Sequence, residues 1–489
     1  MTTIATGTVA SPAKTVRPFS IRDKLGYMFG DFGNDFSFIL QMMFFMLFYT
    51  NIMGIKPAHV GTLFLVVRLV DAFVDVAVGR LVDLSKPRKD GKFRPWIKIF
   101  AIPVALSSAL MYMSFISDWS YTGRLLWMTI SYVLWGSMFY SLINIPYGSM
   151  ASVISNKPEH RAALSVFRST GATLAVLVIQ VVLPLVVYVD RVEPNGAVKA
   201  VLSGSRMTWA AIACAVLSVV FYLLCYVNVA ERVQPPVKAA SERQSFGKML
   251  GSLAKNRAMI GIVIAALLLL VANLLTSAMT GYLWLDYFNS KNLQSVAGFA
   301  GLAPTLLLLG IAPWLSTKFG KKEVGVAVTL LCGVTNIVMY FLNLQHNPTA
   351  FIVLFAVAQF ALATFNYLIW AFITDVIDYQ EVRTTERDDG TVYAIYSWAR
   401  KLGQAIAGGL GGWALGWIGY QSVAKGQPPV EQAQSTLHGI YMLSTLVPGI
   451  VYIGVALALA FIYPLGKKAV AHNVAELEKR HVLAAAAAV

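Results

Sequence analysis

Charged residues are scarce in this sequence: Asp, Glu, Lys and Arg make up 13% of its 489 residues, whereas 57% are hydrophobic. A soluble domain carries about 25% charged residues, so the composition excludes an ordinary soluble protein. Many apolar runs reach about 20 residues, enough to cross a bilayer as a helix. The alternating segments of about 10 residues that are typical of a membrane β-barrel are missing. The composition therefore predicts an all-α integral membrane protein.

Cysteine is also rare, with only Cys214, Cys225 and Cys332. All three lie in apolar runs and outside any CxxC motif, which excludes a disulfide framework and a zinc site. The six histidines lie in loops, near span ends or in the tail, and neither GxSxG nor HExxH occurs. We therefore expect no enzyme activity and no cofactor. A sensor is also disfavoured, because no segment outside the spans is long enough to form a soluble output domain.

The first 24 residues are polar and lack the apolar core of a signal peptide, so we expect the first span to direct insertion. The net charge of +15 could suggest a nucleic-acid partner. Its basic residues instead concentrate in alternate loops, such as 84–95, as the positive-inside rule describes. We therefore predict a multi-pass protein of the cell inner (plasma) membrane, with both termini cytoplasmic, the lipid bilayer as its surroundings and no nucleic-acid partner.

Twelve hydrophobic runs predict twelve transmembrane helices. They lie at roughly 25–53, 60–83, 96–117, 124–152, 163–189, 208–230, 258–286, 294–317, 324–343, 350–379, 392–420 and 437–465. The predicted parts are a cytoplasmic tail (1–24), a six-helix bundle (25–230), a cytoplasmic linker (231–257), a second six-helix bundle (258–465) and a second tail (466–489). This plan is typical of the major facilitator fold, in which two bundles rock around a site near the midplane. We expect a monomer, because each pair of bundles encloses its own pathway.

The second run carries charges that are costly inside a membrane. Arg68, Asp71 and Asp75 are spaced by three and four residues, so they lie on one face of a helix. Two carboxylates this close repel each other, and the pair should readily hold a proton or a metal ion. The alternative is a structural ion pair with Arg68, which is disfavoured because one cation cannot balance two anions.

Polar residues also occur in other predicted spans. They are Asp31, Asn34, Asp35, Ser141, Asn144, Arg168, Arg400 and Lys401, with Asp375, Asp378 and Glu381 at the end of the tenth run. Those near span ends could extend to the membrane interface, and for Asp378, Glu381 and Arg400 this role is as plausible as a functional one. Asp35, Arg168 and Lys401 lie further inside, which favours a function.

Several motifs together resemble one transporter family. KLGYMFGDFGNDF, GTLFLVVRLVDAFVD followed by GKFRPW, WGSMFYSLINIPYGS, TDVIDYQE and the segment around Lys401 resemble the glycoside–pentoside–hexuronide:cation symporters, of which melibiose permease is the best-known member. The resemblance extends from about Lys24 to Leu465. It implies a secondary active transporter that moves a small sugar or glycoside together with H⁺ or Na⁺ by alternating access.

The resemblance also implies roles for matching residues. Asp71 and Asp75 match the cation-binding acids, as metal ligands only if the ion is Na⁺, and Ser141 supplies a nearby hydroxyl. Asp35, Arg168 and Lys401 match substrate-pocket residues, to which Asn144 is added. Acids at the inner gate match Asp375, Asp378 and Glu381, and Arg400 is expected to belong to that gate. Aromatic rings for the faces of a sugar could come from Tyr147, Trp370 and Trp398.

Departures from melibiose permease bear on the substrate and the ion. Asn144 replaces a sugar-binding aspartate and Gly148 a tryptophan, so a pentoside, a xyloside or a glucuronide-like sugar is preferred to a galactoside. Val74 replaces an asparagine beside the cation-binding acids, which weakens the case for Na⁺ and leaves both ions open. The alternative cargo is a lysolipid or another amphiphile, which distant relatives of this family move. That cargo would require a wide apolar cleft with few polar groups.

Overall fold

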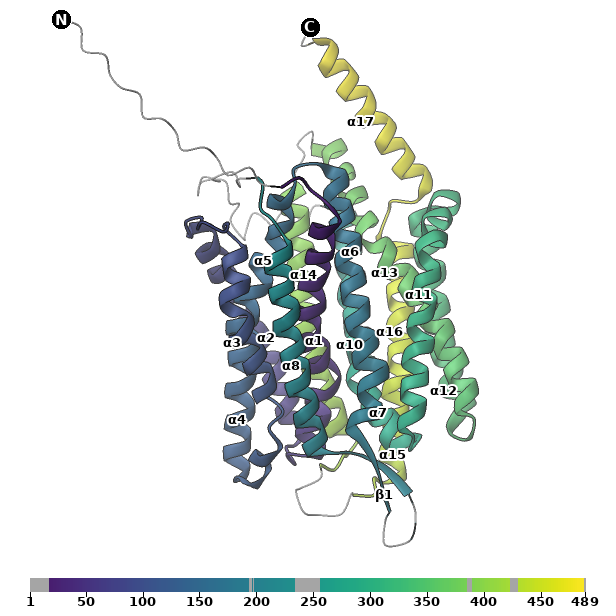
Figure 1. Cartoon of the computed structure of the whole chain (residues 1–489). Coiled ribbons are helices and arrows are strands. Elements are labelled where there is room, and N and C mark those ends of the chain that lie inside the picture. The colour runs from purple at the N-terminus through teal and green to yellow at the C-terminus, as the bar shows by residue number, and fades with distance from the viewer. Residues whose placement is uncertain are drawn as a thin grey trace, which may run out of the picture.

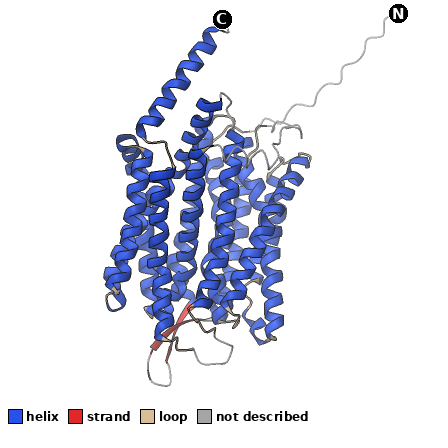
Figure 2. Cartoon of the chain, turned by 180° about the vertical axis from the view of Figure 1, so that it is seen from behind, coloured by secondary structure: helices blue, strands red, loops and turns tan. Residues whose placement is uncertain are grey.

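The computed structural model describes residues 17–192, 196, 198–233, 256–384, 389–422 and 430–487. Most of them belong to long helices that stand side by side in one bundle (Figure 1). Seen from behind, the bundle is helical throughout its height, with strands only at the end opposite the two termini (Figure 2).

The helices of the first half follow one another with short connections. They are α1 (Ile21–Asn51), α2 (Pro57–Leu84), α3 (Arg94–Leu110), α4 (Tyr121–Val133), α5 (Ser141–Ile154), α6 (Pro158–Leu177), α7 (Leu183–Val187) and α8 (Gly204–Asn228). A π-helical segment, Leu134–Tyr140, joins α4 to α5, and another, Val178–Val182, joins α6 to α7. Each pair therefore forms one continuous rod.

The second half repeats this arrangement. Its helices are α10 (Arg257–Tyr282), α11 (Lys291–Phe319), α12 (Lys321–Leu342), α13 (Pro348–Thr384), α14 (Asp389–Trp417), α15 (Gln434–Ser444), α16 (Leu446–Leu457) and α17 (Lys467–Ala487). Short π-helical segments, Leu283–Tyr287 and Ala458–Ile462, extend α10 and α16. The final helix, α17, projects away from the bundle beside the C-terminus (Figure 1).

All twelve predicted apolar runs coincide with helical segments to within a few residues. Within the described residues, nine helices are both long and apolar enough to cross a membrane. The long helices α2, α11 and α14 are not among these nine. A mostly helical membrane protein is thus confirmed, while the count of twelve spans stays a prediction.

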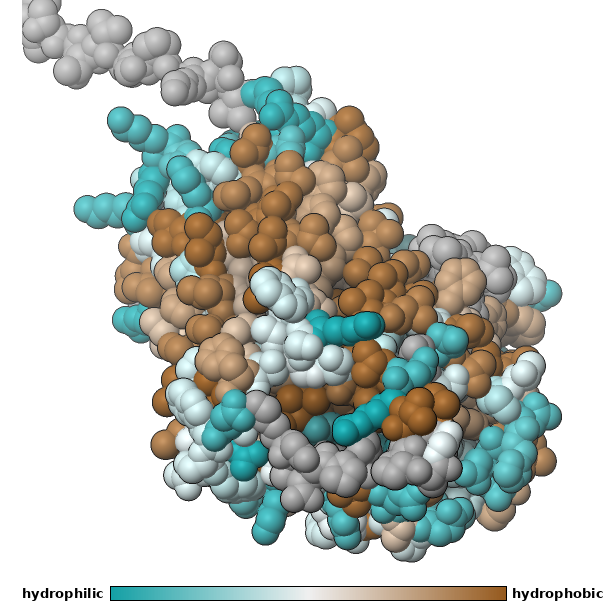
Figure 3. All heavy atoms as spheres, turned by 60° about the horizontal axis from the view of Figure 1, so that its bottom comes forward, coloured by the Kyte–Doolittle hydropathy of each residue, from teal (hydrophilic) through white to brown (hydrophobic). Residues whose placement is uncertain are grey.

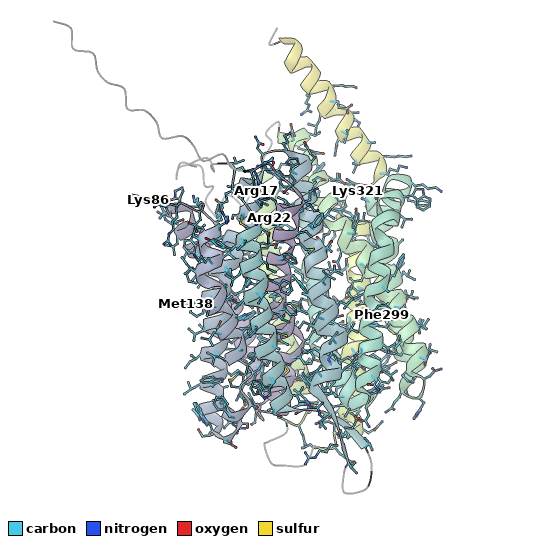
Figure 4. The ribbon with its side chains drawn as sticks, viewed as in Figure 1. Arg17, Arg22, Lys86, Met138, Phe299 and Lys321 are labelled. Carbon is cyan, nitrogen blue, oxygen red and sulfur yellow. The ribbon has the colours of Figure 1, made fainter. Side chains whose placement is uncertain are left out.

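The outer surface of the bundle is apolar at mid-height. Met138 and Phe299 are 48% and 57% exposed, and they project from opposite edges of the bundle (Figure 4). Hydrophobic side chains also cover much of the flank in the space-filling view (Figure 3). Basic side chains such as Arg22, Lys86 and Lys321 lie at the end that carries both termini (Figure 4). An exposed apolar surface of this extent is expected where a protein contacts lipid.

The all-α prediction has one exception, a two-stranded hairpin. Strands β1 (Tyr188–Val192) and β2 (Val198–Leu202) pair antiparallel, with Tyr188 opposite Leu202. Both strands are rich in valine, which favours extended backbone, and Gly196 between them has a φ of 81°. Asn289 of the second half binds β2 at two points, accepting from the Ala200 amide and donating to the Val198 carbonyl, both at 2.9 Å.

Polar contacts also join the two halves at the hairpin end. The hydroxyls of Thr50 and Tyr282 are 2.8 Å apart. The Tyr420 hydroxyl lies 2.9 Å from Asn51 Oδ1 and 3.1 Å from Asp286 Oδ2, and its ring meets that of Tyr282 edge-on. We call Thr50, Asn51, Tyr282, Asp286 and Tyr420 the hairpin-end latch, since they tie α1 to α10 and to the segment after α14.

Close packing of α2 against α14 depends on glycine. A Cβ atom added to Gly61 would lie 2.6 Å from the Gly409 carbonyl oxygen, and one added to Gly412 would lie 2.6 Å from the Gly61 backbone. Separations this short are not tolerated by a real side chain, so the two helix backbones touch only because neither residue has one. The glycines therefore fix the closed arrangement of the two halves near the hairpin.

We predict that Gly412→Ala destabilises this closed arrangement. The added methyl group would overlap the α2 backbone, and overpacking of this kind costs about 1–3 kcal/mol. Thermal unfolding of the purified protein in detergent measures the effect. Gly416→Ala is the matched control, because its Cβ would meet only Ala58 at an ordinary 3.7 Å. Equal unfolding temperatures for the two variants would contradict the prediction.

Candidate functional site

A polar cavity of about 340 Å³ lies between the two halves. α1, α2, the rod of α4 and α5, and α6 form most of its wall, and α14 supplies the rest. The lining residues are Asp31, Asn34, Asp35, Phe38, Arg68, Asp71, Asp75, Gly136, Tyr140, Ser141, Asn144, Arg168, Arg400, Lys401 and Gln404. Four of them are acidic and four are basic. This cavity collects most of the charged residues that the sequence places inside predicted spans.

Asp71 and Asp75 of α2 face two hydroxyls on the neighbouring rod. Ser141 Oγ donates to Asp75 Oδ1 at 2.6 Å, and Ser137 Oγ donates to Asp71 Oδ1. Both pairs are separated by four residues, so the same spacing repeats on the two helices. Ser137 lies in the π-helical segment Leu134–Tyr140, a kind of distortion that is frequent at functional sites. Asp71 and Asp75 thus lie on one face of α2, as predicted. This face meets two hydroxyls, those of Ser137 and Ser141, rather than the one that was expected.

Each acid of α2 also meets a basic side chain. Lys401 Nζ lies 2.5 Å from Asp75 Oδ2, which forms an ion pair between the second half and the first. Arg68 Nη1 lies 3.8 Å from Asp71 Oδ2. Arg68 also donates to Gln41 Oε1 at 3.4 Å and lies over the Phe38 ring. The sequence alone indicated one cation for two acids, whereas the structure supplies Lys401 as the second.

Asp31 and Asp35 of α1 have different partners. Arg168 Nε donates to Asp31 Oδ1 at 2.9 Å, which forms an ion pair. The Asn34 amide donates to Asp35 Oδ1 at 3.2 Å and to the Tyr140 hydroxyl at 2.9 Å, and it accepts from Tyr222 at 3.1 Å. Asn34 therefore orients Asp35. The four-residue spacing of Asp31 and Asp35 was the signal that both would face one site.

Of the three predicted aromatic contacts, Tyr147 and Trp398 do not line this cavity. Tyr147 is fully buried, its hydroxyl donates to the Tyr27 carbonyl at 2.7 Å, and Arg168 lies over its ring. Trp398 is half-buried and packs against the hydrophobic core of the second half. The side chain of Trp370 lies outside the described residues. Contact of the three rings with a substrate stays a prediction, which for Tyr147 and Trp398 would require the rings to move.

The predicted gate residues separate into two places. Asp375 accepts from Lys321 Nζ at 2.6 Å, which joins α13 to α12 within the second half. Asp378 and Glu381 follow on α13 and are half-buried. Arg400 forms part of the cavity wall beside Lys401. Its assignment to the gate stays a prediction.

Sequence reasoning gave no role to Gln404 in the cavity wall or to Ser137, which is buried and binds Asp71. Neither residue carried a visible signal, since one serine or glutamine in an apolar run is common. Arg68, which also lines the cavity, was considered only as a partner for the acids. The positions of these side chains depend on packing between distant segments.

Comparison with known proteins gives consistent matches over nearly the whole chain. The family described as "MFS/sugar transport protein" matches residues 26–467. The uncharacterized symporter YjmB of Bacillus subtilis (strain 168) is 30% identical, over 96% of this chain and 97% of its own. The glucuronide carrier protein homolog of Escherichia coli (strain K12) is 29% identical, over 94% and 96%. The crystal structure of the nucleoside transporter NupG superposes with a TM-score of 0.58 at 14% identity, over 91% and 100%, and supports the fold.

We predict that Lys401 and Asp75 stabilise each other. Removing one partner leaves a partly buried charge unpaired, so Lys401→Met and Asp75→Asn should each destabilise the protein. The loss of unfolding free energy in the double variant should be smaller than the sum of the losses in the two single variants. The difference, the interaction free energy, should be about 1–3 kcal/mol. Thermal or denaturant unfolding of the four proteins gives this energy. Additive losses would show that the pair contributes nothing.

Proposed function

The chain belongs to the family of MFS/sugar transport proteins, and we propose that it is a secondary active symporter of a sugar or glycoside with H⁺ or Na⁺. It is a membrane transporter and not an enzyme. The observation that carries the proposal is the position of Asp75. One of its oxygens accepts from Ser141 in the first half and the other meets Lys401 in the second. A cation bound there would act on both halves at once.

The coupling step that we infer is a competition for Asp75. Lys401 occupies the position that a cation would take beside this carboxylate. When H⁺ or Na⁺ binds, it neutralises the Asp75 carboxylate in place of the Lys401 ammonium group. Lys401 can then donate a hydrogen bond to a substrate oxygen. Substrate binding and cation binding then favour each other, and this coupling must be reciprocal. A proton requires only a carboxylate, whereas Na⁺ would use Asp71 and Asp75 with the hydroxyls of Ser137 and Ser141.

The cavity suits a small polar substrate. Asp35 and Asn144 can hydrogen-bond sugar hydroxyls, while Arg168 and Arg400 supply positive charge. A volume of about 340 Å³ is in the range of small-molecule sites, and its charged wall does not favour a lysolipid or another amphiphile. Among the preferred pentosides, xylosides and glucuronide-like sugars, two observations support an acidic sugar. Arg400 places a positive charge in the cavity wall, and the chain is similar to a glucuronide carrier homolog.

The proposed architecture follows the major facilitator plan. Twelve spans form bundles at 25–230 and 258–465, the linker 231–257 lies mostly outside the described residues, and the protein is a monomer of the inner membrane.

With both termini in the cytoplasm, the hairpin end is the outer end. The hairpin-end latch and the α2–α14 glycines then close the outer side, which corresponds to an inward-facing state. Opening outward would require the latch to break and the gate acids Asp375, Asp378 and Glu381 to form salt bridges with the basic cytoplasmic loops.

We predict that uptake depends on the α2 acids. Proteoliposomes containing the protein, a radiolabelled glucuronide or xyloside, and either a proton or a sodium gradient should accumulate substrate under one gradient. Asp71→Asn and Asp75→Asn should lower that accumulation by at least about tenfold, because the substrate loses its coupling to the ion.

Asp83→Asn is the matched control for these variants, as an acid on the same helix outside the cavity wall. It should accumulate substrate like the unchanged protein. Full accumulation in Asp75→Asn would contradict the proposed coupling. If a folded protein moved no sugar under either gradient, the sugar assignment itself would be wrong.

Arg400 should select for an acidic sugar. In Arg400→Gln, we expect the KM for methyl glucuronide to rise by about 10–100-fold, because the substrate carboxylate loses its ionic partner. The KM for neutral methyl xyloside should change by less than about twofold, within the spread of ordinary substitutions. Arg383→Gln, at the end of α13, is the matched control. An equal rise in KM for both sugars would show that Arg400 does not bind the carboxylate of the acidic sugar.

A further inference from the structure

A second, smaller cavity lies wholly within the second half. It has a volume of about 190 Å³ and is formed by α10, α13 and α14. Its wall consists of Ala266, Leu269, Leu270, Asn366, Ile369, Tyr396 and Arg400. We call this space the side chamber. Arg400 belongs to its wall and also to the wall of the polar cavity, so this residue lies where the two spaces meet.

The chemical character of the side chamber differs from that of the polar cavity. Among the described residues of the wall, Ala266, Leu269, Leu270 and Ile369 are apolar, Asn366 and Tyr396 are polar and neutral, and Arg400 is charged. Ala266 and Leu269 are buried at 1% and 4% exposure, so this wall is not a lipid-facing surface. The apolar side of this pocket can bury an apolar group, while Asn366, Tyr396 and Arg400 supply polar contacts.

We propose that the side chamber is a subsite for the compact apolar aglycone of a glycoside. The inference rests on the proposed function, in which the sugar ring occupies the polar cavity. Arg400 would then pair with the acid group of the sugar at the junction, and the aglycone would extend past it between α10 and α13. The substrate would thereby contact both halves of the protein.

The size of the side chamber sets the kind of aglycone. An engineered apolar cavity of about 150 Å³ holds a benzene molecule, so a space of this volume accepts a single aromatic ring. A second fused ring would exceed it without rearrangement of the wall. The subsite therefore favours a phenyl glycoside over both a methyl glycoside and a naphthyl glycoside.

Binding of methyl, phenyl and naphthyl β-D-glucuronide to the purified full-length protein tests the proposal by calorimetry. The unchanged protein should bind the phenyl compound at least about tenfold more tightly than the methyl compound, since burial of a ring contributes more than one decade of affinity. Ala266→Phe places a ring inside the side chamber. It should cancel this preference while it leaves methyl glucuronide binding within about twofold.

A second variant tests the subsite in the opposite direction. Leu269→Ala enlarges the side chamber and should increase the affinity for naphthyl glucuronide. Leu268→Ala is the matched control, because Leu268 is the preceding residue of α10 and is not in the chamber wall. Ala266→Phe removes room and Leu269→Ala adds it, so a folding defect in one leaves the other informative.

The outcomes separate the subsite from the proposed function. Equal affinity for methyl and phenyl glucuronide in the unchanged protein would overturn the subsite and leave glucuronide binding intact. The same holds if Ala266→Phe binds methyl glucuronide and still prefers the phenyl compound. If none of the three glucuronides binds while the protein is folded, the glucuronide-like substrate is wrong, and the subsite is overturned with it.

Discussion

The ion pair between Lys401 and Asp75 is the contact on which the working of this structure depends. It is the point where α14 of the second half enters the charged wall of the first, at an N–O distance of 2.5 Å. A partly buried carboxylate without a cation is costly, so Asp75 must keep some positive partner at every stage. When that partner is Lys401, the two halves are held together at the cavity. In the proposed symport, a bound ion would replace Lys401 and release α14, so that occupancy of the site would be linked to the arrangement of the halves.

The same two helices also carry the closest backbone contact between the halves. Towards the hairpin end, α2 and α14 touch through Gly61, Gly409 and Gly412. One turn or two further along α2, side chains replace this direct contact and the polar cavity begins. The ion pair lies 14 residues from Gly61 along α2 and eight residues from Gly409 along α14, so the same two helices carry both contacts between the halves. In the proposed transport cycle, a change at Asp75 would act on a helix pair that is already packed backbone to backbone.

The fold and the α2 acids could be predicted from the sequence because both depend on local periodicity. Apolar run length gives the helices, and four-residue spacing places Asp71 and Asp75 on one face. Pairing between helices depends instead on how each rod is rotated and tilted, which no single segment encodes. For this reason Arg168 was assigned to the same pocket as Asp35 without its partner Asp31, and the place of Arg400 in the cavity wall was not foreseen. The hairpin escaped notice because its strands are only five residues long and lie beside a far stronger helical signal.

In the proposed symport of an acidic sugar, charge balance in the polar cavity would favour binding of the sugar and the cation together. The wall contains four acidic and four basic side chains, so the empty cavity has no net formal charge. A cation alone would leave the cavity positive, and an anionic sugar alone would leave it negative. In a medium of low dielectric constant either state is unfavourable, whereas binding both restores neutrality. In this proposal, coupling of the sugar to the cation requires no additional site, because the charge of each ligand balances the charge of the other.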